Sequence, residues 1–277
     1  MLILLPASDA KASVGRGQEL DPAGLSFPAL AATRAAVLDA LVEVSAGPDA
    51  TDRLCVPASM HDVVRRNVGL RDAPTATAET VYAGVLHDAL GLADLDPASR
   101  RRARAWIVVI SALWGAVRLG DRIPSYRLDM CGRLPGLAHL PDVWREPLGE
   151  VLPAAAGRGV VVDGRSAEYA TAWRPTGALA ERTVVLKVVR DRGSGRGSAS
   201  HHAKHTRGLV VRQIVTDGVD PRRPEGLAEV LANHFEVDLR RPDRAGRTWE
   251  LRVVERLGRD QALRSSSALS VASARRQ

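Results

Sequence analysis

The sequence predicts a mixed fold of the α+β class, and three observations support this prediction. Segments with helical spacing dominate the first half of the chain, short β-branched segments begin near its centre, and two strand-like segments joined by a turn-rich loop close the folded part. The 277 residues, 45% of them hydrophobic, suffice for one large domain or two small ones.

The first half begins with one strand and continues mainly as helices. Residues 1–5 are apolar and end at Pro6, which predicts a buried strand. Residues 7–28 contain Gly, Ser, Asp and Pro without a sustained period, which predicts a long loop, and loops of that length are often functional. Apolar residues at helical spacing then predict helices at 29–44, 59–67, 76–91 and 97–105.

The second half combines strands with shorter helices. β-branched residues predict a strand at 107–110, after which residues 116–141 are interrupted by Gly and Pro. A helix is favoured over a strand at 204–216, because Gly208 near its start is the one interruption. The remaining predicted elements are a helix at 144–152, strands at 159–162 and 183–189, a helix at 224–232, and a β-hairpin with strands at 235–239 and 249–254.

The C-terminal residues differ in composition from the rest of the chain. Residues 258–277 are rich in Ser and Arg and poor in bulky apolar side chains, so we expect a folded domain of residues 1–257 followed by a disordered tail. The formal net charge is +7, which suggests a nucleic-acid partner. Residues 256–277 contribute +4 of this charge, so the basicity of the whole chain is weak evidence for nucleic-acid binding by the folded part.

Composition also excludes several classes of protein. The two cysteines, Cys55 and Cys131, are too few for a disulfide framework or a cysteine-rich zinc site, and a reducing cytoplasm fits them best. The N-terminus lacks the basic segment and the apolar length of a signal peptide. The longest apolar stretch, residues 106–119, is shorter than the roughly 20 residues a membrane-spanning helix needs. We therefore expect a cytoplasmic protein without a membrane partner.

Lysine is rare in this chain. Lys11, Lys187 and Lys204 are the only lysines, whereas the other 36 basic residues are arginines. This indicates a coding bias that replaces Lys with Arg wherever either residue serves. A retained lysine therefore marks either chance or a site where the flexible ammonium, whose pKa can be lowered, is needed in place of a planar guanidinium.

The densest polar motif is Ser-His-His-Ala-Lys-His-Thr-Arg-Gly at residues 200–208. A helix beginning near Ala203 would place its free amides beside Lys204 and Arg207, which makes an anion site for the phosphate of a nucleic acid or a nucleotide. The alternative is a solvated basic first turn.

Three histidines in the same motif are weak candidates for a metal site. On a strand, two of them would point to opposite faces, and neither cysteine partners nor an HExxH pattern accompany them. The sequence therefore predicts no metal site. The three candidates are His201, His202 and His205.

Two further clusters contain candidate site residues. Arg127, with Tyr126 before it and apolar residues after it, is either a buried ion-pair anchor or a planar fork for phosphate or carboxylate. Ser166 and Tyr169 follow a predicted strand, where they belong either to a site or to a simple helix cap. No G-x-S-x-G, Walker A or G-x-G-x-x-G motif occurs in its required context, so the common hydrolase and dinucleotide-binding classes lose support, and no cofactor is indicated.

Four blocks together resemble the YaaA family of peroxide stress proteins. They are residues 1–11, 111–130, 166–169 and 200–208, and the match is ordered over about residues 1–255. The resemblance implies a single mixed α/β domain of unusual topology, with a central sheet flanked by helices and a positively charged cleft. It also implies DNA binding and limitation of iron-driven oxidative damage to DNA. The implied cleft residues are Lys11, Tyr126, Arg127, Ser166, Tyr169, Lys204 and Arg207.

Two functional hypotheses follow. In the first, the cleft contacts DNA phosphates without reading sequence, through Lys11, Tyr126, Arg127, Lys204 and Arg207. In the second, the protein is an enzyme of specialised metabolism that acts on a nucleotide, an adenylate or a carboxylate-bearing molecule. Lys11 or Lys204 would then act as nucleophile or proton carrier.

Two other residues bear on these hypotheses. Ser166 and Tyr169 would be hydrogen-bond donors in the enzyme. Cys131 stands where many members of the family have glycine, and it is either a small buried side chain or a reactive thiol activated by nearby cations.

Overall fold

The computed structural model describes residues 1–189 and 199–254. Within these residues, seven strands form one sheet in the order β4-β3-β1-β6-β7-β9-β8. The five inner strands are parallel, and each outer strand is antiparallel to its neighbour. The strands are β1 (Leu2–Pro6), β3 (Ile107–Ser111), β4 (Gly115–Arg118), β6 (Val161–Asp163), β7 (Thr183–Val188), β8 (Glu236–Arg240) and β9 (Trp249–Val254), and a separate antiparallel pair consists of β2 (Thr75–Thr77) and β5 (Arg122–Pro124).

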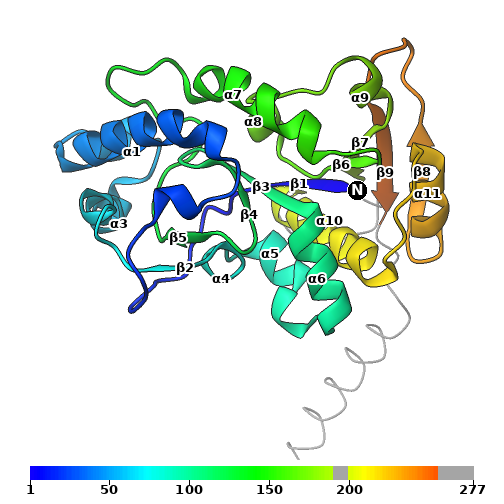
Figure 1. Ribbon diagram of the computed structural model, residues 1–277, viewed down its shortest axis with the longest axis horizontal. Coiled ribbons are helices and arrows are strands. Elements are labelled where there is room, and N and C mark those ends of the chain that lie inside the picture. Colours follow the sequence, from blue (N-terminus) through cyan, green and yellow to red (C-terminus); the bar gives the residue numbers. More distant parts are fainter. Residues whose placement is uncertain (190–198, 255–277) are drawn as a thin grey trace, which may run out of the picture.

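Helices cover both faces of this sheet. Figure 1 shows α7 and α8 on one side, α5, α6 and α10 on the other, and α1 and α3 at the end of the molecule opposite β8 and α11. The α-helices are α1 (Ala31–Ala46), α2 (Ala50–Arg53), α3 (His61–Arg65), α4 (Ala78–Val81), α5 (Val85–Leu90), α6 (Pro97–Trp106), α7 (Leu140–Ala155), α8 (Ala167–Ala170), α9 (Gly177–Glu181), α10 (Ala199–Asp217) and α11 (Pro224–Ala232). Short 3₁₀ turns are η1 (Pro22–Gly24), η2 (Pro28–Leu30), η3 (Ala58–Met60), η4 (Arg66–Gly69) and η5 (Leu92–Asp94).

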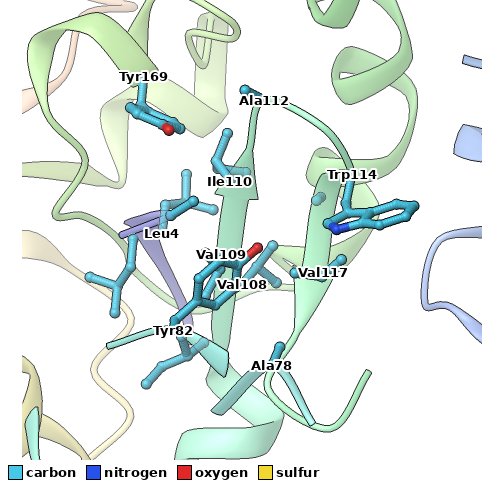
Figure 2. Close-up of a cluster of buried hydrophobic side chains, with 14 of the residues drawn as sticks. Leu4, Ala78, Tyr82, Val108, Val109, Ile110, Ala112, Trp114, Val117 and Tyr169 are labelled. Carbon is cyan, nitrogen blue, oxygen red and sulfur yellow. The ribbon is translucent and has the colours of Figure 1, made fainter. Parts of the chain in front are cut away.

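The strands at the centre of the sheet, β1, β3 and β6, are almost entirely buried, as parallel strands between two helical layers must be. Leu2, Ile3, Leu4 and Leu5 are each at most 1% exposed, and every residue of β3 is buried. Figure 2 shows side chains of β1 and β3 packed together in this core. Continuous apolar runs, rather than alternating ones, therefore specify the centre of the sheet.

The turn into β4 depends on one glycine. Gly115 has a φ of 68°, and a Cβ at this position would lie 2.4 Å from the ring of Trp144. The Trp144 indole N–H in turn donates to Ala112 O at 2.8 Å. Only glycine allows both this backbone conformation and this close approach, so α7 is fixed against the β3–β4 turn.

The structure confirms the mixed α+β class, the central mixed sheet and the C-terminal hairpin. The predicted single helix at 76–91 is wrong. Gly84, with a φ of 100°, separates α4 from α5, and the preceding residues pair as β2. β4 and β5 lie in a segment for which no strand was predicted, because runs of three or four residues carry too little alternation to be recognised. The predicted tail lies outside the described residues, and the boundary at residue 257 stays a prediction.

The strand order creates a position for a site. The chain leaves β1 toward β3 on one side and leaves β6 toward β7 on the other side. Because these connections diverge, the carboxyl ends of β1 and β6 mark the edge at which open parallel sheets commonly bind ligands. The loop from residue 7 and the segment containing Ser166 both begin at this edge.

Candidate functional site

Lys11 lies at the carboxyl edge of the sheet, in the loop that follows β1. Its backbone forms an isolated bridge with Tyr82, and its Nζ donates to Ser8 O at 2.7 Å. The same Nζ lies 4.2 Å from the centroid of the Tyr126 ring. Burial lowers the pKa of Lys11 to about 8, and the charge of Arg127 adds to this effect, whereas carboxylates nearby oppose it. The Lys11 amine therefore exchanges a proton close to neutral pH.

Arg127 forms a buried ion pair beside Lys11. Its Nη2 donates to Asp129 Oδ2 at 2.7 Å, and its Nη1 donates to Asp9 O at 2.7 Å. The backbone of Arg127 is held by the amide of Asn67, which donates to Arg127 O at 2.8 Å and accepts from Arg127 N at 2.9 Å. Two hydrogen-bonding atoms of the pair, Arg127 Nε and Asp129 Oδ1, are buried without a partner.

Lys204 reaches the same loop from a distant part of the chain. Its Nζ lies 2.9 Å from Asp9 Oδ2, and both side chains are partly exposed. α10 comes close enough because Gly208 packs against α5, where a Cβ would lie 2.3 Å from Leu86 O. We name Asp9, Lys11, Arg127, Asp129 and Lys204 the Asp9 cluster.

The two carboxylates of the Asp9 cluster are in different electrostatic environments. Burial alone would raise the pKa of Asp9, but the hydrogen bond from Lys204 and the charges of Lys204, Arg127 and Lys11 outweigh it and hold this pKa below its usual value. Burial raises the pKa of Asp129 despite the opposing charges of Arg127 and Lys11. Asp9 is therefore a stable anion, whereas Asp129 takes up a proton more readily than a free aspartate.

A chain of hydroxyl groups lies under Lys11. Tyr82 Oη is 3.1 Å from Tyr126 Oη, which is 2.7 Å from Ser111 Oγ, and Ser111 Oγ accepts from Trp114 N at 3.0 Å. Burial raises the pKa of Tyr82 to about 12 and that of Tyr126 well above its usual value. Figure 2 shows Tyr82 lying across β3. Both tyrosines are thus neutral phenols, and Tyr126 presents its ring rather than its hydroxyl to Lys11.

Ser166 and Tyr169 follow β6. Ser166 Oγ accepts from Tyr169 N at 3.5 Å, so Ser166 is the N-cap of α8. Tyr169 lies beyond the carboxyl end of β3 in Figure 2. It is 4% exposed, and its hydroxyl is buried without a hydrogen-bond partner. Burial, together with the negative charge of Asp129, raises the pKa of Tyr169 well above its usual value.

Arg207 lies one turn after Lys204 on α10. Its Nε is buried without a partner, and burial lowers its pKa while the charge of Asp163 opposes this shift. No hydrogen bond or ion pair between Arg207 and the Asp9 cluster is present among the described residues. The charge of Arg207 therefore interacts with Asp163 at the end of β6 rather than with Lys11.

Two cavities meet at Asp9 and Ala10. The larger, of about 340 Å³, is lined by Lys11, Tyr126 and Arg127, with Arg66 at its side. The smaller, of about 170 Å³, is lined by Lys204, His87 and the loop after β1. Ser166, Tyr169 and Arg207 line neither of these two cavities. The structure thus gathers Lys11, Tyr126, Arg127 and Lys204 around one loop and leaves the other three sequence candidates at its margin.

Comparisons with known proteins show the family to which the chain belongs. The sequence pattern of the family described as peroxide stress protein YaaA matches residues 1–240. The chain belongs to the YaaA family. It is 46% identical over 257 residues to a UPF0246 protein of Streptomyces coelicolor, covering 92% of this chain and 98% of the relative. It is 36% identical over 232 residues to a UPF0246 protein of Corynebacterium efficiens, covering 83% and 90%.

Three residues of this candidate site were missed from the sequence. Asp9 and Asp129 stand inside the motifs that supplied Lys11 and Arg127, and the acidic neighbours of those cations were the available signal. His87 was hidden in a segment predicted as plain helix. Its Nε2 lies 3.2 Å from Pro6 O, its ring stacks on Tyr82, and burial lowers its pKa to about 4.

The predicted local structure of the 200–208 motif is wrong in one respect. α10 already includes Ala199, so Lys204 lies more than one turn inside the helix, away from free N-terminal amides. The three histidines His201, His202 and His205 are helical, so the argument from strand alternation does not apply to them. Among the described residues, no group of three His, Cys, Asp or Glu side chains is arranged to hold a metal ion.

In the same part of the chain, no helix is long and apolar enough to cross a membrane.

Cys131 differs from the cation-activated thiol considered above. Burial, a hydrogen bond with Cys55 and neighbouring acidic groups raise its pKa to about 12. The cations of the Asp9 cluster therefore do not activate this thiol.

Proposed function

We propose that this YaaA-family protein serves the peroxide stress response by binding a small anionic molecule at the Asp9 cluster. The observation that carries the proposal is a group of unpartnered polar atoms in and next to the Asp9 cluster, of which Arg127 lines the larger cavity. Arg127 Nε, Asp129 Oδ1 and Tyr169 Oη are buried without hydrogen bonds. Each such atom costs about 1–3 kcal/mol, so their retention around one cluster supports groups that complete their hydrogen bonds when a ligand binds.

The charges of the Asp9 cluster suit an anion. Three cations, Lys11, Arg127 and Lys204, face the two carboxylates Asp9 and Asp129, of which Asp129 has a raised pKa. A phosphate or carboxylate group that enters the larger cavity meets the planar guanidinium of Arg127 and the amine of Lys11. Chemically, these two groups supply an anion clamp and an amine that can move a proton.

Lys11 gives the site a capacity for chemistry beyond binding. An amine whose pKa is about 8 is partly neutral at physiological pH, and neutral amines act as nucleophiles or general bases. The ring of Tyr126 and the backbone of Ser8 fix its position. In the proposed reaction class, Lys11 is the proton carrier or nucleophile and Arg127 holds the anionic substrate, a nucleotide, adenylate or other phosphate- or carboxylate-bearing molecule.

DNA binding is the second candidate, and the exposed side chain of Arg66 favours it. Arg66 lines the same cavity as Lys11 and Arg127, so a backbone phosphate could bridge the surface and the pocket. Against this reading, the side chain of Arg127 is buried, so the phosphate of a polymer backbone would have to enter the pocket to reach it. We therefore favour a small anion over DNA.

Binding assays at two salt concentrations separate the candidates. Fluorescence anisotropy with a labelled DNA duplex, and calorimetry with inorganic phosphate and adenosine monophosphate, are to be run on the wild-type protein and on Lys11→Arg. We expect a small anion to bind with modest salt dependence and to lose at least about tenfold in affinity in Lys11→Arg, because the larger planar guanidinium cannot take the place of the compact ammonium between Ser8 O and the Tyr126 ring.

The matched control is Lys187→Arg, since Lys187 is an exposed lysine on β7. It should leave small-anion binding unchanged. Duplex binding that falls steeply with salt and survives Lys11→Arg, together with no binding of either small anion, would contradict the small-anion proposal and support DNA.

A further inference from the structure

The two cysteines of the chain lie next to each other although 75 residues separate them in sequence. Cys55 Sγ donates to Cys131 O at 3.2 Å, and Arg133 N donates to Arg53 O at 2.8 Å on the same pair of segments. Cys55 is exposed, Cys131 is half-buried, and both are free thiols. Two backbone segments in direct contact thus hold one accessible and one sheltered thiol side by side.

The backbone at Cys55 is strained. Its φ of 55° is in the left-handed region, which costs a residue with a Cβ about 1–2 kcal/mol. Such a conformation persists only where the surrounding structure imposes it, and strained residues cluster at functional sites. Here the imposed conformation keeps the Cys55 side chain directed at the Cys131 backbone. The structure therefore holds the two thiols in a defined position relative to each other.

We propose that Cys55 and Cys131 form a peroxide-sensitive modification site that closes to an intramolecular disulfide. In the first step, the Cys55 sulfur attacks one oxygen of hydrogen peroxide, the O–O bond breaks, and the products are a sulfenic acid and water. In the second step, the Cys131 sulfur attacks the Cys55 sulfur, an S–S bond forms, the S–O bond of the sulfenic acid breaks, and its hydroxyl leaves as a second water with the proton of the Cys131 thiol. Two thiols lose two electrons in total, and one peroxide gains them.

The environments of the two sulfurs decide their order of reaction. Cys55 is the exposed thiol, so peroxide reaches it first. Cys131 is sheltered, and its high pKa keeps it protonated and slow toward peroxide. Cys131 is then the resolving thiol.

The bond would act on the neighbourhood of the proposed site. Cys131 is two residues beyond Asp129, and Gly132 N donates to Asp129 O at 3.0 Å. A disulfide would link this segment covalently to the end of α2 and replace the contact between Cys55 Sγ and Cys131 O. The inference does not depend on which molecule the Asp9 cluster binds, because it concerns only the two thiols and peroxide.

The test is peroxide treatment of the reduced full-length protein, followed by thiol counting and non-reducing peptide mass mapping. We expect one equivalent of peroxide to convert two free thiols to none, with a Cys55–Cys131 linked peptide in a monomeric protein, and dithiothreitol to restore both thiols. Cys131→Ser should instead stop at a sulfenic acid on Cys55 that dimedone traps. Cys55→Ser should keep one unreacted thiol.

Three results would overturn the proposal. They are the absence of the linked peptide when the Cys55 thiol is consumed, a disulfide that forms only between two molecules, and equal rates of peroxide consumption by wild type and Cys55→Ser. Unfolding in urea before treatment provides a further readout. If the folded geometry promotes the bond, the unfolded chain should form the intramolecular disulfide more slowly, and an equal rate would contradict the role of that geometry.

Discussion

Two buried arginine–aspartate pairs in this protein have the same sequence separation and different degrees of hydrogen-bond satisfaction. Arg165 donates from Nε and Nη2 to the two oxygens of Asp163, at 2.9 and 2.7 Å, and from Nη2 also to Trp173 O at 2.9 Å. Arg127 makes one bond to Asp129, and each partner keeps one buried atom unpartnered. The first pair fixes the segment after β6, whereas the second lies beside a cavity.

The difference shows how a structural ion pair and a functional one can be told apart. Residue types and spacing are nearly identical, since in each case two residues of opposite charge stand two positions apart. A pair that satisfies its hydrogen-bonding atoms gains nothing from a ligand, whereas a partly satisfied pair does. Satisfaction of hydrogen bonds, which only the folded structure reveals, therefore identifies Arg127 and Asp129 as the candidates for binding.

The largest expected effect is on the satisfied pair. Arg165→Gln leaves Asp163 as a buried charge without its bidentate partner, so we expect the free energy of unfolding to fall by about 3–5 kcal/mol. Urea denaturation followed by circular dichroism measures this change. The matched control is Arg145→Gln, whose partner Asp142 is exposed, and which should cost less than about 1 kcal/mol. Equal effects of the two substitutions would refute the assigned structural role of Arg165.

The next largest expected effect is a pH dependence of the free energy of unfolding, and it comes from His87. Its pKa is about 4 in the folded protein and about 6.5 in the unfolded chain, so between these values the unfolded state binds the proton first. Stability is therefore fully present above pH 6.5 and is lost as the pH falls toward 4, by about 3 kcal/mol in all. Urea midpoints measured from pH 7.5 to 4 should show this loss in the wild type and a flatter profile in His87→Asn. An identical slope in both proteins would contradict it.

A smaller effect on stability is expected at the partly satisfied pair. Asp129→Asn removes one charged hydrogen bond but also a buried carboxylate whose pKa is raised, so we expect a loss of only about 1 kcal/mol. Because the charge of Asp129 opposes the lowering of the Lys11 pKa, the same substitution should move the titration of the Lys11 amine to lower pH. A loss as large as that of Arg165→Gln, or an upward shift of the Lys11 titration, would remove the distinction between the two pairs.

The sequence was sufficient for six of the seven strands of the described main sheet and for part of the site. Apolar runs located β1, β3 and β7, because parallel inner strands are continuously apolar, and the scarcity of lysine singled out Lys11 and Lys204. The structure brings those two lysines to the same loop, where both act electrostatically on Asp9. Lys187, the third, lies exposed on β7, where chance retention explains it.

The rest of the site depends on contacts between distant parts of the chain. Lys204 and Asp9 are 195 positions apart, and they meet because α10 packs closely on α5 at Gly208. No local sequence pattern predicts this contact between the two helices. The unpartnered hydroxyl of Tyr169 was equally hidden, since a tyrosine after a helix cap has the same sequence whether or not its hydroxyl finds a partner. Whether a polar atom finds a hydrogen-bond partner depends on the fold and not on the spacing of residues in the sequence.

The central claim, that Lys11 is a proton-exchanging amine in an anion site, can be tested by nuclear magnetic resonance of the protein labelled with ¹³C at lysine Cε. Three lysines give three signals, which Lys→Arg variants assign. We expect the Lys11 signal to titrate near pH 8 and to shift when inorganic phosphate is added, while the Lys187 signal does not respond to phosphate. A Lys11 signal that titrates near the ordinary lysine value of about 10.4 and ignores phosphate would contradict the account.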